Sequence, residues 1–529
     1  MSSLLELIDN APPRSVALNY AGEAIDFGTL AAASARVAGG LAGLGVGAGD
    51  RVALWLPNVP AWLVAFFACA RLGAIAVSVN TRFRATEVGD IVGRSRARVL
   101  VLWPDFHGID FAGILAAVEP AALAGVEHVV AYGEGATTGA VPTLAGRTGI
   151  PWATLATHAP LAIGAARDAA RCVVFTTSGT TRAPKFVCHV QGTVAAHAHD
   201  VVAALELDAP GTRVLQALPM CGVFGFTQAL SALAARAPMD LLPVFDAVAA
   251  SRLVREHDIT HMHGVDDMIA AMLDAVDEAQ PFPSLRLFGY AAFNPSLEDI
   301  AARAEARGVT LCGLYGMSEC HALYAMQPPT LPLAERRKGG GRPLSPRAEV
   351  RVRDPASGAL LPPGQTGELE VSGPSLLAEY LDDAAATAAA LTADGFLRTG
   401  DLAYLEEDGR FCYLARMGDV LRLGGFLVSP LEIEAVLDAH PQIGASQVVA
   451  IELDGRTRVV AFVTEAHGAG ALDEPAVIAW CRARLAAYKV PARVLAIEAF
   501  PTTASANGTK IQKARLRAMA LERCTAAPS

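Results

Sequence analysis

A short apolar run that ends in a hydroxyl-rich loop constrains this chain more than any other stretch. Residues 172–175 are β-branched, aromatic or cysteine, which predicts a buried strand. Hydroxyl and backbone N–H groups in a loop after such a strand can point at one anion. Lys185 adds a mobile point charge that suits a polyphosphate. The stretch therefore predicts a phosphate-holding loop, formed by Thr176, Thr177, Ser178, Gly179, Thr180 and Thr181.

This loop differs from a Walker A loop. Pro184 and Phe186 stand where that motif requires glycine and a serine or threonine. A polar surface loop rich in serine and threonine would account for the same residues. The loop alone leaves both interpretations open, and the rest of the chain is needed to decide between them.

Length, charge and cysteine usage narrow the class of protein. A chain of 529 residues is too long for one ordinary domain, and roughly two to four domains or subdomains with large cores are expected. The net charge is −10 and no basic stripe is present, which argues against nucleic acid as the main partner. Nine cysteines are scattered without a C-x-x-C pair. They favour a reducing cytoplasm over a disulfide framework or a zinc site.

Two stretches are considered as a signal peptide or a membrane span. The first residues lack a basic start and a long apolar core, so no signal peptide is expected. Residues 61–79 are apolar enough to suggest a membrane span, but Arg71 and Gly73 interrupt them. We expect a helix followed by a short strand inside a core, and no membrane span.

Helix-like and strand-like segments alternate over residues 1 to about 170, which predicts parallel βαβ units. Later strands end in small-residue loops, where ligands gather in open α/β sheets. The expected elements are helices over 25–44 and 193–205, strands over 51–56, 74–79, 97–102, 214–218, 285–288 and 309–311, and a loop over 134–160.

Four histidines fall on these elements. His197 and His199 are expected on the surface of a helix rather than as metal ligands, because no third ligand has metal spacing. His261 and His263 would share one face of a strand. A structural or pocket-lining role is favoured for them over a metal pair, because an H-x-H pair alone is weak.

The character of the chain changes near residue 340, where three glycines precede shorter segments with turn signals. Position 350 and residues 367–371 and 411–414 predict a small β unit. After residue 416, Ser429, Pro430 and Glu432 begin a helix. A hairpin over 447–464 and a helix over 476–485 follow. The expected fold class is α/β: a large N-terminal domain of layered sheets with the small β unit, 1–416, and a smaller α+β domain, 417–529.

Lysine is rare in this chain. Only five of its 43 basic residues are lysine. Where lysine persists, a compact ammonium rather than a planar guanidinium can be required. We expect Lys185 and Lys510 to be the two that are chemically needed.

Eight stretches, in order over roughly residues 20–517, resemble the adenylate-forming superfamily of acyl-CoA synthetases, peptide-synthetase adenylation domains and luciferases. They are TTSGTTRAPKF (176–186), LPMCGVFG (218–225), LYGMSE (314–319), GELEVSGP (367–374), LRTGDL (397–402), ARMGDVLRLGGFLVSPLEIE (415–434), YKVP (488–491) and NGTKIQKARLR (507–517). The resemblance implies that the small C-terminal domain is mobile and rotates about a hinge between two half-reactions.

The resemblance implies the chemistry as well. A carboxylate attacks the α-phosphate of ATP and releases pyrophosphate, and a thiol then displaces AMP. A phosphoryl step needs mostly positioning and charge stabilisation, which a hydroxyl-rich loop, Mg²⁺ and a lysine supply. ATP, Mg²⁺ and coenzyme A are the implied cofactors, with a small-molecule carboxylic acid as substrate.

Residue roles follow from the same resemblance. Lys510 is the implied catalytic lysine, which domain rotation removes from the site, and Lys185 and Glu319 act with it. Glu319 is the implied Mg²⁺ ligand, with Thr180 beside it. Tyr315 is expected on the adenine and Asp401 on the ribose hydroxyls. The ATP- and AMP-binding set is Thr177, Ser178, Gly179, Thr180, Thr181, Tyr315, Gly316, Ser318, Asp401 and Arg416, and the CoA-binding set is Gly424, Gly425 and Phe426.

The acyl pocket is expected to lie among residues after three of the predicted strands. No acidic residue stands where amino-acid-activating domains hold an α-amino group, which favours an apolar acid: medium-chain, alicyclic or aromatic. The expected lining is Gly222, Val223, Phe224, Phe226, His263, Gly264, Tyr290 and Ala291.

The sequence therefore predicts an ATP-dependent carboxylate–CoA ligase, cytoplasmic, and a monomer or homodimer. Arg182 and Phe186 replace a glycine and a small residue of the family loop. They motivate an alternative, an enzyme with weakened adenylation that mainly transfers a supplied acyl-adenylate to CoA. Loading of a carrier protein is a further alternative, which the lack of a fused carrier domain disfavours. A non-enzymatic nucleotide-binding protein is disfavoured, because the motifs of both half-reactions are present.

Overall fold

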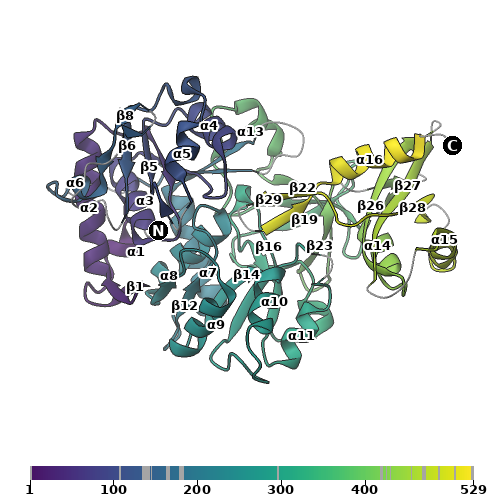
Figure 1. The fold of residues 1–529 in the computed structure, drawn as a ribbon. Helices are drawn as coiled ribbons and strands as arrows, with labels where there is room; N and C mark the ends of the chain where they lie inside the picture. Colours follow the sequence, from purple (N-terminus) through teal and green to yellow (C-terminus); the bar gives the residue numbers. More distant parts are fainter. Residues whose placement is uncertain are drawn as a thin grey trace.

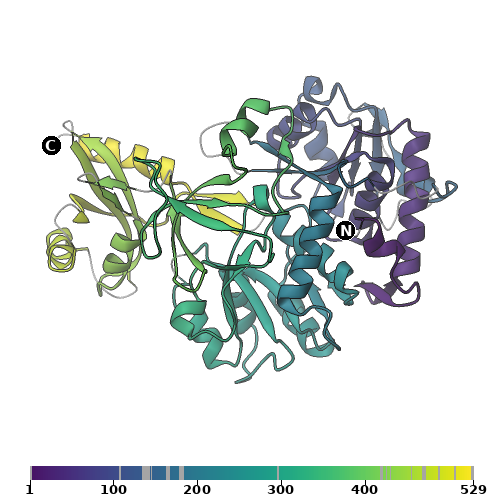
Figure 2. The same cartoon turned by 180° about the vertical axis from the view of Figure 1, so that it is seen from behind.

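A computed structural model shows a large body and a smaller module beside it (Figure 1). The helices nearest the N-terminus lie at the far end of the large body from the C-terminal module, as the reverse view also shows (Figure 2). The structure describes residues 3–106, 109–133, 143–144, 146–161, 167–177, 184–294, 297–417, 421–423, 426–428, 430–453, 456–466, 472–485, 489–505 and 508–525.

One sheet of the large body has eight strands. Its central strands are parallel, as the alternation of segments in residues 1–170 predicts. The edge strand β21 arrives from a distant part of the sequence and pairs with β11. In order across the sheet the strands are β21 (Glu379–Tyr380), β11 (Phe186–Val190), β10 (Arg171–Thr176), β4 (Ile75–Ser78), β3 (Arg51–Trp55), β5 (Val99–Leu102), β6 (His128–Ala131) and β9 (Ile150–Pro151).

The second sheet has thirteen strands. It is parallel from β16 to β1 and antiparallel beyond β16. The predicted small β unit has its own apolar core and joins this sheet edge to edge through β18. The order is β19 (Val350–Arg353), β20 (Gly367–Val371), β22 (Leu397–Leu405), β23 (Phe411–Arg416), β18 (Gly340–Pro343), β17 (Ala325–Met326), β16 (Leu311–Tyr315), β15 (Leu287–Ala291), β14 (His261–Val265), β12 (Val214–Gln216), β13 (Met239–Leu241), β1 (Val16–Tyr20) and β2 (Glu23–Asp26).

Helices cover both sheets and fill the space between them. The helix α3 is buried along its whole length, in a core shared with α7 and α8. That burial explains the apolar stretch at residues 61–79, and among the described residues no helix is long and apolar enough to cross a bilayer. The helices of the large body are α1 (Glu6–Asp9), α2 (Phe27–Gly43), α3 (Pro60–Leu72), α4 (Ala85–Arg94), α5 (Phe111–Ala116), α6 (Trp152–Ala156), α7 (Gln191–Leu205), α8 (Val223–Ala235), α9 (Ala247–Glu256), α10 (Asp266–Asp274), α11 (Ile300–Ala306), α12 (Leu333–Arg336) and α13 (Ala384–Ala390).

Two sequence expectations are wrong. The stretch 134–160 is not only a loop, because its described part contains α6, β9 and a short hairpin of β7 (Thr143–Leu144) and β8 (Arg147–Thr148). His197 is not on the surface either. His197 lies on α7 and is buried. Neighbouring structure, including α8, covers this helix on more than one face.

The C-terminal module is α+β. A long hairpin pairs with β28, and two apolar clusters form its own core. The predicted boundary at residues 416 and 417 stays a prediction. The elements are β24 (Leu421–Leu423), β25 (Phe426–Val428), α14 (Pro430–Asp438), β26 (Ile443–Leu453), β27 (Arg456–Glu465), α15 (Glu474–Arg482), β28 (Arg493–Ala496), β29 (Thr502–Ser505), β30 (Gly508–Ile511) and α16 (Lys513–Thr525).

Candidate active site

Both ends of the predicted phosphate loop are held together by backbone contacts. The strands β10 and β11 are antiparallel neighbours, so the loop leaves and re-enters the sheet at adjacent positions. Beyond them the N–H of Thr177 donates to the carbonyl of Lys185 at 3.0 Å, and the N–H of Lys185 donates to Oγ1 of Thr177 at 3.1 Å. The strand pair thus fixes the base of the loop. Ser178, Gly179, Thr180, Thr181 and Arg182 lie outside the described residues.

Lys185 and Glu319 are linked through a tyrosine that the sequence analysis missed. The ammonium of Lys185 lies 4.4 Å from the ring centroid of Tyr380, and the Tyr380 hydroxyl donates to Oε1 of Glu319 at 2.8 Å. Burial, and then the Glu319 carboxylate, raise the pKa of Tyr380 well above its usual range, so the hydroxyl remains a donor. The pairing of β21 with β11 positions Tyr380, and no local pattern in the sequence reveals that pairing.

Glu319 fits the role of a magnesium ligand. Its side chain is 6% exposed, and the hydrogen bond from Tyr380 engages only one of its two carboxylate oxygens. Mg²⁺ prefers hard oxygen ligands and is usually held by one or two carboxylates together with substrate phosphates. Among the described residues there is no group of three or more histidine, cysteine, aspartate or glutamate side chains that could hold a metal ion.

Asp401 and Arg416 face each other across two strands. They are register partners on β22 and β23, with Nη1 of Arg416 3.0 Å from Oδ1 of Asp401. The same Nη1 also donates to the carbonyl of Thr399 at 2.7 Å. Oδ1 of Asp401 is thus buried and ion-paired with Arg416, but it has no second partner of good hydrogen-bond geometry among the described residues. A carboxylate oxygen has two lone pairs, so Oδ1 can also accept from a ligand hydroxyl, such as those of a ribose.

Tyr315 connects this pair to the Glu319 segment. Its hydroxyl donates to Oδ2 of Asp401 at 2.5 Å, and its ring packs against Phe411 and Tyr413. Burial raises the pKa of Asp401, with the Glu319 charge adding to it, while Arg416 opposes the shift. Contacts thus join Lys185 to Glu319 through Tyr380, and they join Asp401 to Tyr315, which precedes Glu319 in the same segment. Gly316 and Ser318 lie within that segment, after the end of β16.

The predicted acyl-pocket residues divide into two groups. The ring of Phe224 stacks on His263, whose Nδ1 accepts a hydrogen bond from the Gly289 N–H, and Phe226 packs against the ring of Phe175 at the end of β10. Tyr290 instead donates its hydroxyl to the carbonyl of Arg337 at 3.0 Å. Gly222, Val223 and Gly264 are buried with the first group, and Ala291 follows Tyr290 at the end of β15.

A cavity of about 490 Å³ lies between the large body and the C-terminal module. Tyr290, Lys338 and Arg416 line it from the large body, and Ile511 and Lys513 line it from the module. Both views show the hairpin of β29 and β30 directed toward the large body (Figures 1 and 2). Lys510 lies on β30, where it is the register partner of Thr503 and directly precedes Ile511, a residue that lines the cavity.

The predicted CoA-binding residues are only partly covered by the structure. Gly424 and Gly425 lie outside the described residues. Phe426 begins β25, which pairs with β24 after residue 420. Their expected contact with a pantetheine chain stays a prediction.

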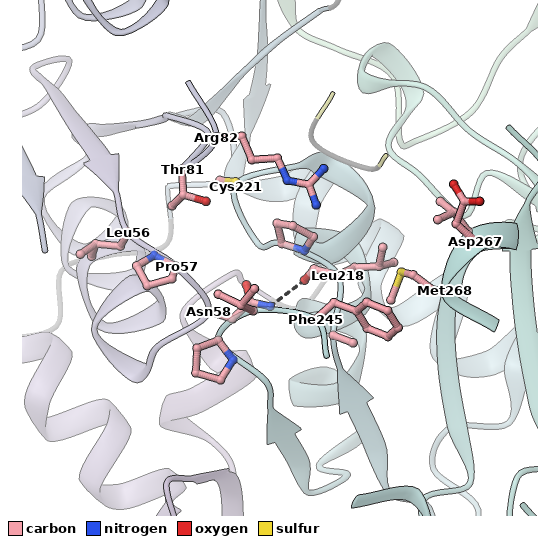
Figure 3. A pocket seen from close by; sticks show the side chains of 15 residues that line it. Leu56, Pro57, Asn58, Thr81, Arg82, Leu218, Cys221, Phe245, Asp267 and Met268 are labelled. Carbon is pink, nitrogen blue, oxygen red and sulfur yellow. Dashed lines mark hydrogen bonds between the residues drawn. The ribbon is translucent and has the colours of Figure 1, made fainter. Parts of the chain in front are cut away.

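A second cavity, of about 240 Å³, lies where strands of both large sheets end (Figure 3). Asn58 closes one side, its Nδ2 donating to the carbonyl of Leu218 at 2.9 Å. The guanidinium of Arg82 extends toward the middle of the group. Leu218 begins the LPMCGVFG stretch, so this cavity adjoins the segment that carries the predicted acyl pocket.

Comparisons with known proteins agree with this arrangement. The family model described as AMP-binding enzyme matches residues 6–381, and the model of the AMP-binding enzyme C-terminal domain matches residues 432–507. A 4-coumarate–CoA ligase from Oryza sativa subsp. japonica is 30% identical over 517 residues, covering 94% of this chain and 90% of the relative.

Two further relatives cover nearly the whole chain. A dioxo-octahydroindenyl-propanoyl:CoA ligase from Mycobacterium tuberculosis is 32% identical over 495 residues, 91% of each protein. The crystal structure of ATP-bound MatB from Rhodopseudomonas palustris superposes with a TM-score of 0.82 at 26% identity, covering 98% of both chains. ATP, Mg²⁺ and coenzyme A are the cofactors of this class. The chain therefore belongs to the AMP-binding enzyme family within the adenylate-forming superfamily, and it is an AMP-forming acid–CoA ligase.

Proposed function

We propose that this enzyme activates an apolar carboxylic acid, alicyclic, aromatic or medium-chain, as its acyl-adenylate and transfers the acyl group to coenzyme A. The observation that carries the proposal is the contact path from Lys185 through Tyr380 to Glu319, together with the hydrogen bond to Asp401 from Tyr315, which precedes Glu319 in the same segment. A phosphate-binding lysine, a metal-binding carboxylate and a ribose acceptor are what one bound nucleotide requires.

The residues divide the work of the first half-reaction. Lys185 and the loop after Thr177 hold the phosphates, and Asp401 with Arg416 holds the ribose. Glu319 would hold Mg²⁺, which would supply charge neutralisation on the phosphates. Tyr380 fixes the orientation of the Glu319 carboxylate by its hydrogen bond. Lys510 meets the oxygens of the carboxylate and the α-phosphate, where negative charge builds up as pyrophosphate leaves.

The second half-reaction needs access for a thiol. We assign the binding of coenzyme A to the cavity of Figure 3, which adjoins the LPMCGVFG stretch and contains the Arg82 guanidinium. Coenzyme A carries phosphates, and arginine recognises phosphate with a planar fork of donors. Rotation of the C-terminal module withdraws Lys510 and brings residues 424–426 toward the thiol.

The substrate class rests on the apolar surroundings of the site. Phe224 and Phe226 are buried in the shared core beside Phe175. Two relatives are named for acids with a ring system, one aromatic and one alicyclic. An acid of this kind fits an apolar pocket, because it has few groups besides its carboxylate that need polar partners.

Of the two residues that motivate the alternative with weakened adenylation, only Arg182 still supports it. Phe186 packs into the core on the α4 side of its sheet, under the guanidinium of Arg94, whereas His189 on the same strand reaches Ser318. Side chains alternate between faces along a strand, so Phe186 does not crowd the Glu319 side. Acid-dependent exchange of labelled pyrophosphate into ATP distinguishes the full ligase from the enzyme with weakened adenylation.

The test is a panel of carboxylic acids assayed for pyrophosphate release, followed by AMP formation with coenzyme A. The proposal expects release that requires an acid, is fastest with ring-bearing or medium-chain acids, and yields an acyl-CoA thioester. Release that no acid stimulates, or a preference for amino acids, would contradict it.

A further inference from the structure

One arginine on the surface of the large body holds the chain on both sides of Lys185. Arg94, the last residue of α4, donates from Nη2 to the carbonyl of Pro184 at 2.7 Å. The central carbon of the same guanidinium lies 4.4 Å from the centroid of the Phe186 ring. Arg94 therefore contacts both the residue before and the residue after the lysine that is proposed to bind phosphate.

The peptide unit that leads into Lys185 is held at both of its polar groups. Its carbonyl, that of Pro184, accepts from Arg94. Its N–H, that of Lys185, donates to Oγ1 of Thr177 at 3.1 Å, and the carbonyl of Lys185 accepts from the N–H of Thr177 at 3.0 Å. A peptide unit is planar. Contacts at both of its edges therefore fix the orientation of the plane and the position of the lysine backbone.

Arg94 is itself held in one orientation. Its Nε and Nη2 donate to the two carboxylate oxygens of Asp90, each at 2.8 Å, one helical turn earlier on α4. Nη2 carries two hydrogens, so it can serve both Asp90 and the carbonyl of Pro184. Such an arrangement depends on the planar fork of the guanidinium, which a lysine ammonium does not provide.

The two faces of the chain at this point have different roles. Phe186 packs into the apolar cluster beneath α4 and offers its ring to Arg94. The small residue that the family loop has at this position would offer no such ring. On the other face Lys185 is exposed, with its ammonium over the ring of Tyr380, which bonds to Glu319. Arg94 thus fixes the backbone from the side opposite to the candidate nucleotide site.

We propose that Arg94 is a positioning residue for the adenylation half-reaction. It holds the backbone of Lys185 so that the ammonium is placed for the phosphates of ATP that leave as pyrophosphate. Charge that is already in place requires no reorganisation during the reaction. Without the support of Arg94, part of the binding free energy of ATP goes into ordering the lysine. The inference rests on the proposed function, because it takes Lys185 as the group that meets the phosphates.

A contribution to stability alone explains these contacts less well. The side chain of Arg94 is 40% exposed, and its pair with Asp90 has the i,i+4 spacing of an ordinary surface ion pair. Pairs of this kind contribute little to the free energy of unfolding. Removal of Arg94 should therefore leave the fold intact and release the backbone of Lys185.

The test compares the two half-reactions in Arg94→Ala. Acid-dependent pyrophosphate release is measured against ATP concentration, with the best acid of the panel described above. Transfer to coenzyme A is measured separately from the synthetic adenylate of that acid. We expect the KM for ATP to rise about threefold to tenfold, as for a charged hydrogen bond at a partly exposed site. The transfer step should keep its rate, because its adenylate carries only one phosphate. An unchanged KM for ATP, or equal losses in both steps, would overturn the proposal.

A double variant shows whether Arg94 acts through the lysine. In a chain that carries Lys185→Ala, the further change Arg94→Ala should have little effect on the KM for ATP, because the group that it positions is gone. Full additivity of the two effects would overturn the proposal. If Arg94→Ala does not fold, Asp90→Ala takes its place in the same assays, because it removes the support of the guanidinium. An unchanged KM for ATP in that folded variant would also refute the proposal.

Arg252→Ala is the matched control. Arg252 is exposed on α9 and pairs with Glu256 at 3.1 Å, also with i,i+4 spacing, so its removal should leave both half-reactions unchanged. Lys185→Ala separates the inference from the function on which it rests. A raised KM for ATP in Lys185→Ala beside a normal value in Arg94→Ala refutes this inference alone. A normal value in Lys185→Ala, or no acid that supports pyrophosphate release, refutes the proposed function as well.

Discussion

The Tyr380 hydroxyl donates to Oε1 of Glu319 at 2.8 Å, joining two segments 61 residues apart in sequence. The tyrosine ring also lies 4.4 Å from the ammonium of Lys185. One side chain thus touches both the base of the phosphate loop and the metal-binding candidate. The relationship assigns Tyr380 a positioning role, because its hydroxyl orients the Glu319 carboxylate.

Tyr380→Phe should slow pyrophosphate release and increase the Mg²⁺ concentration needed for half-maximal rate. A hydrogen bond to a charged group contributes about 1.5–3 kcal/mol, which corresponds to roughly a tenfold to hundredfold loss of rate. Tyr324→Phe is the matched control, because that hydroxyl lies against backbone carbonyls, 2.8 Å from that of Ser372 and 3.2 Å from that of Glu349, and not against a charged group. An unchanged Mg²⁺ dependence in Tyr380→Phe would remove the positioning role.

Asp401→Asn should raise KM for ATP about tenfold or more, because it converts a charge-assisted contact to the ribose into a neutral one. Removal of one charge from a buried ion pair also lowers the stability of the protein. A control variant that loses stability in the same way is therefore needed. Glu370→Gln supplies it: this carboxylate is 0% exposed and pairs with Arg351 and Arg353 on the neighbouring strand β19. Equal increases of KM in both variants would show that lost stability, and not nucleotide contact, is the cause.

Arg82→Ala should raise KM for coenzyme A by roughly fivefold to tenfold, since a phosphate contact with a charged donor contributes about 1–1.5 kcal/mol at an exposed site. Pyrophosphate release without coenzyme A should keep its rate. Arg84 is exposed two residues away but does not line the cavity, so Arg84→Ala should leave both constants unchanged. A normal KM for coenzyme A in Arg82→Ala would place the acceptor elsewhere.

The free energy of unfolding should fall as the pH drops from about 6.5 toward 5. Burial lowers the pKa of His189 and His261 to about 4 and that of His263 to about 3, and lowers those of His197 and His321 as well. The unfolded chain then binds more protons than the folded chain, so stability is present above pH 6.5 and lost below it. Each such group costs up to about 1.4 kcal/mol per pH unit.

Buried carboxyls act in the opposite direction. Burial raises the pKa of Asp438 to about 6 and also raises those of Asp266, Glu368 and Asp401, so their protonation favours the folded state as the pH falls. The five histidines dominate between pH 7.0 and 5.5, because their ordinary pKa of about 6.5 lies within that interval. Urea unfolding at pH 7.0 and 5.5 measures the difference, both values being chosen around the ordinary histidine pKa of about 6.5. Equal or higher stability at the lower pH would contradict the account.

Local signals in the sequence were sufficient for much of the fold. Alternating apolar segments predicted β3, β4 and β5 and their parallel pairing, and the structure confirms them. The hairpin β26–β27 and the helix α14 after Ser429 also follow from local patterning and capping residues. Such features depend on neighbours within a few positions of the chain.

Long-range contacts account for what the sequence did not reveal. Tyr380 reaches Glu319 only because β21 pairs with β11, about 190 residues earlier in the chain. His197 was expected at the surface because no third ligand with metal spacing accompanied it, whereas α7 buries this side chain. The stacking of His189, His197 and His321 brings together three elements whose proximity no single segment encodes.

The central claim is that the large body and Lys510, from the C-terminal module, act on one nucleotide. The direct measurement is acid-dependent pyrophosphate release by Lys510→Ala, beside Arg515→Ala, which removes an exposed cation five residues away. We expect release by Lys510→Ala to fall by about 10²–10³, with transfer from supplied acyl-adenylate to coenzyme A retained and Arg515→Ala active in both steps. Full-rate release by Lys510→Ala would contradict the account.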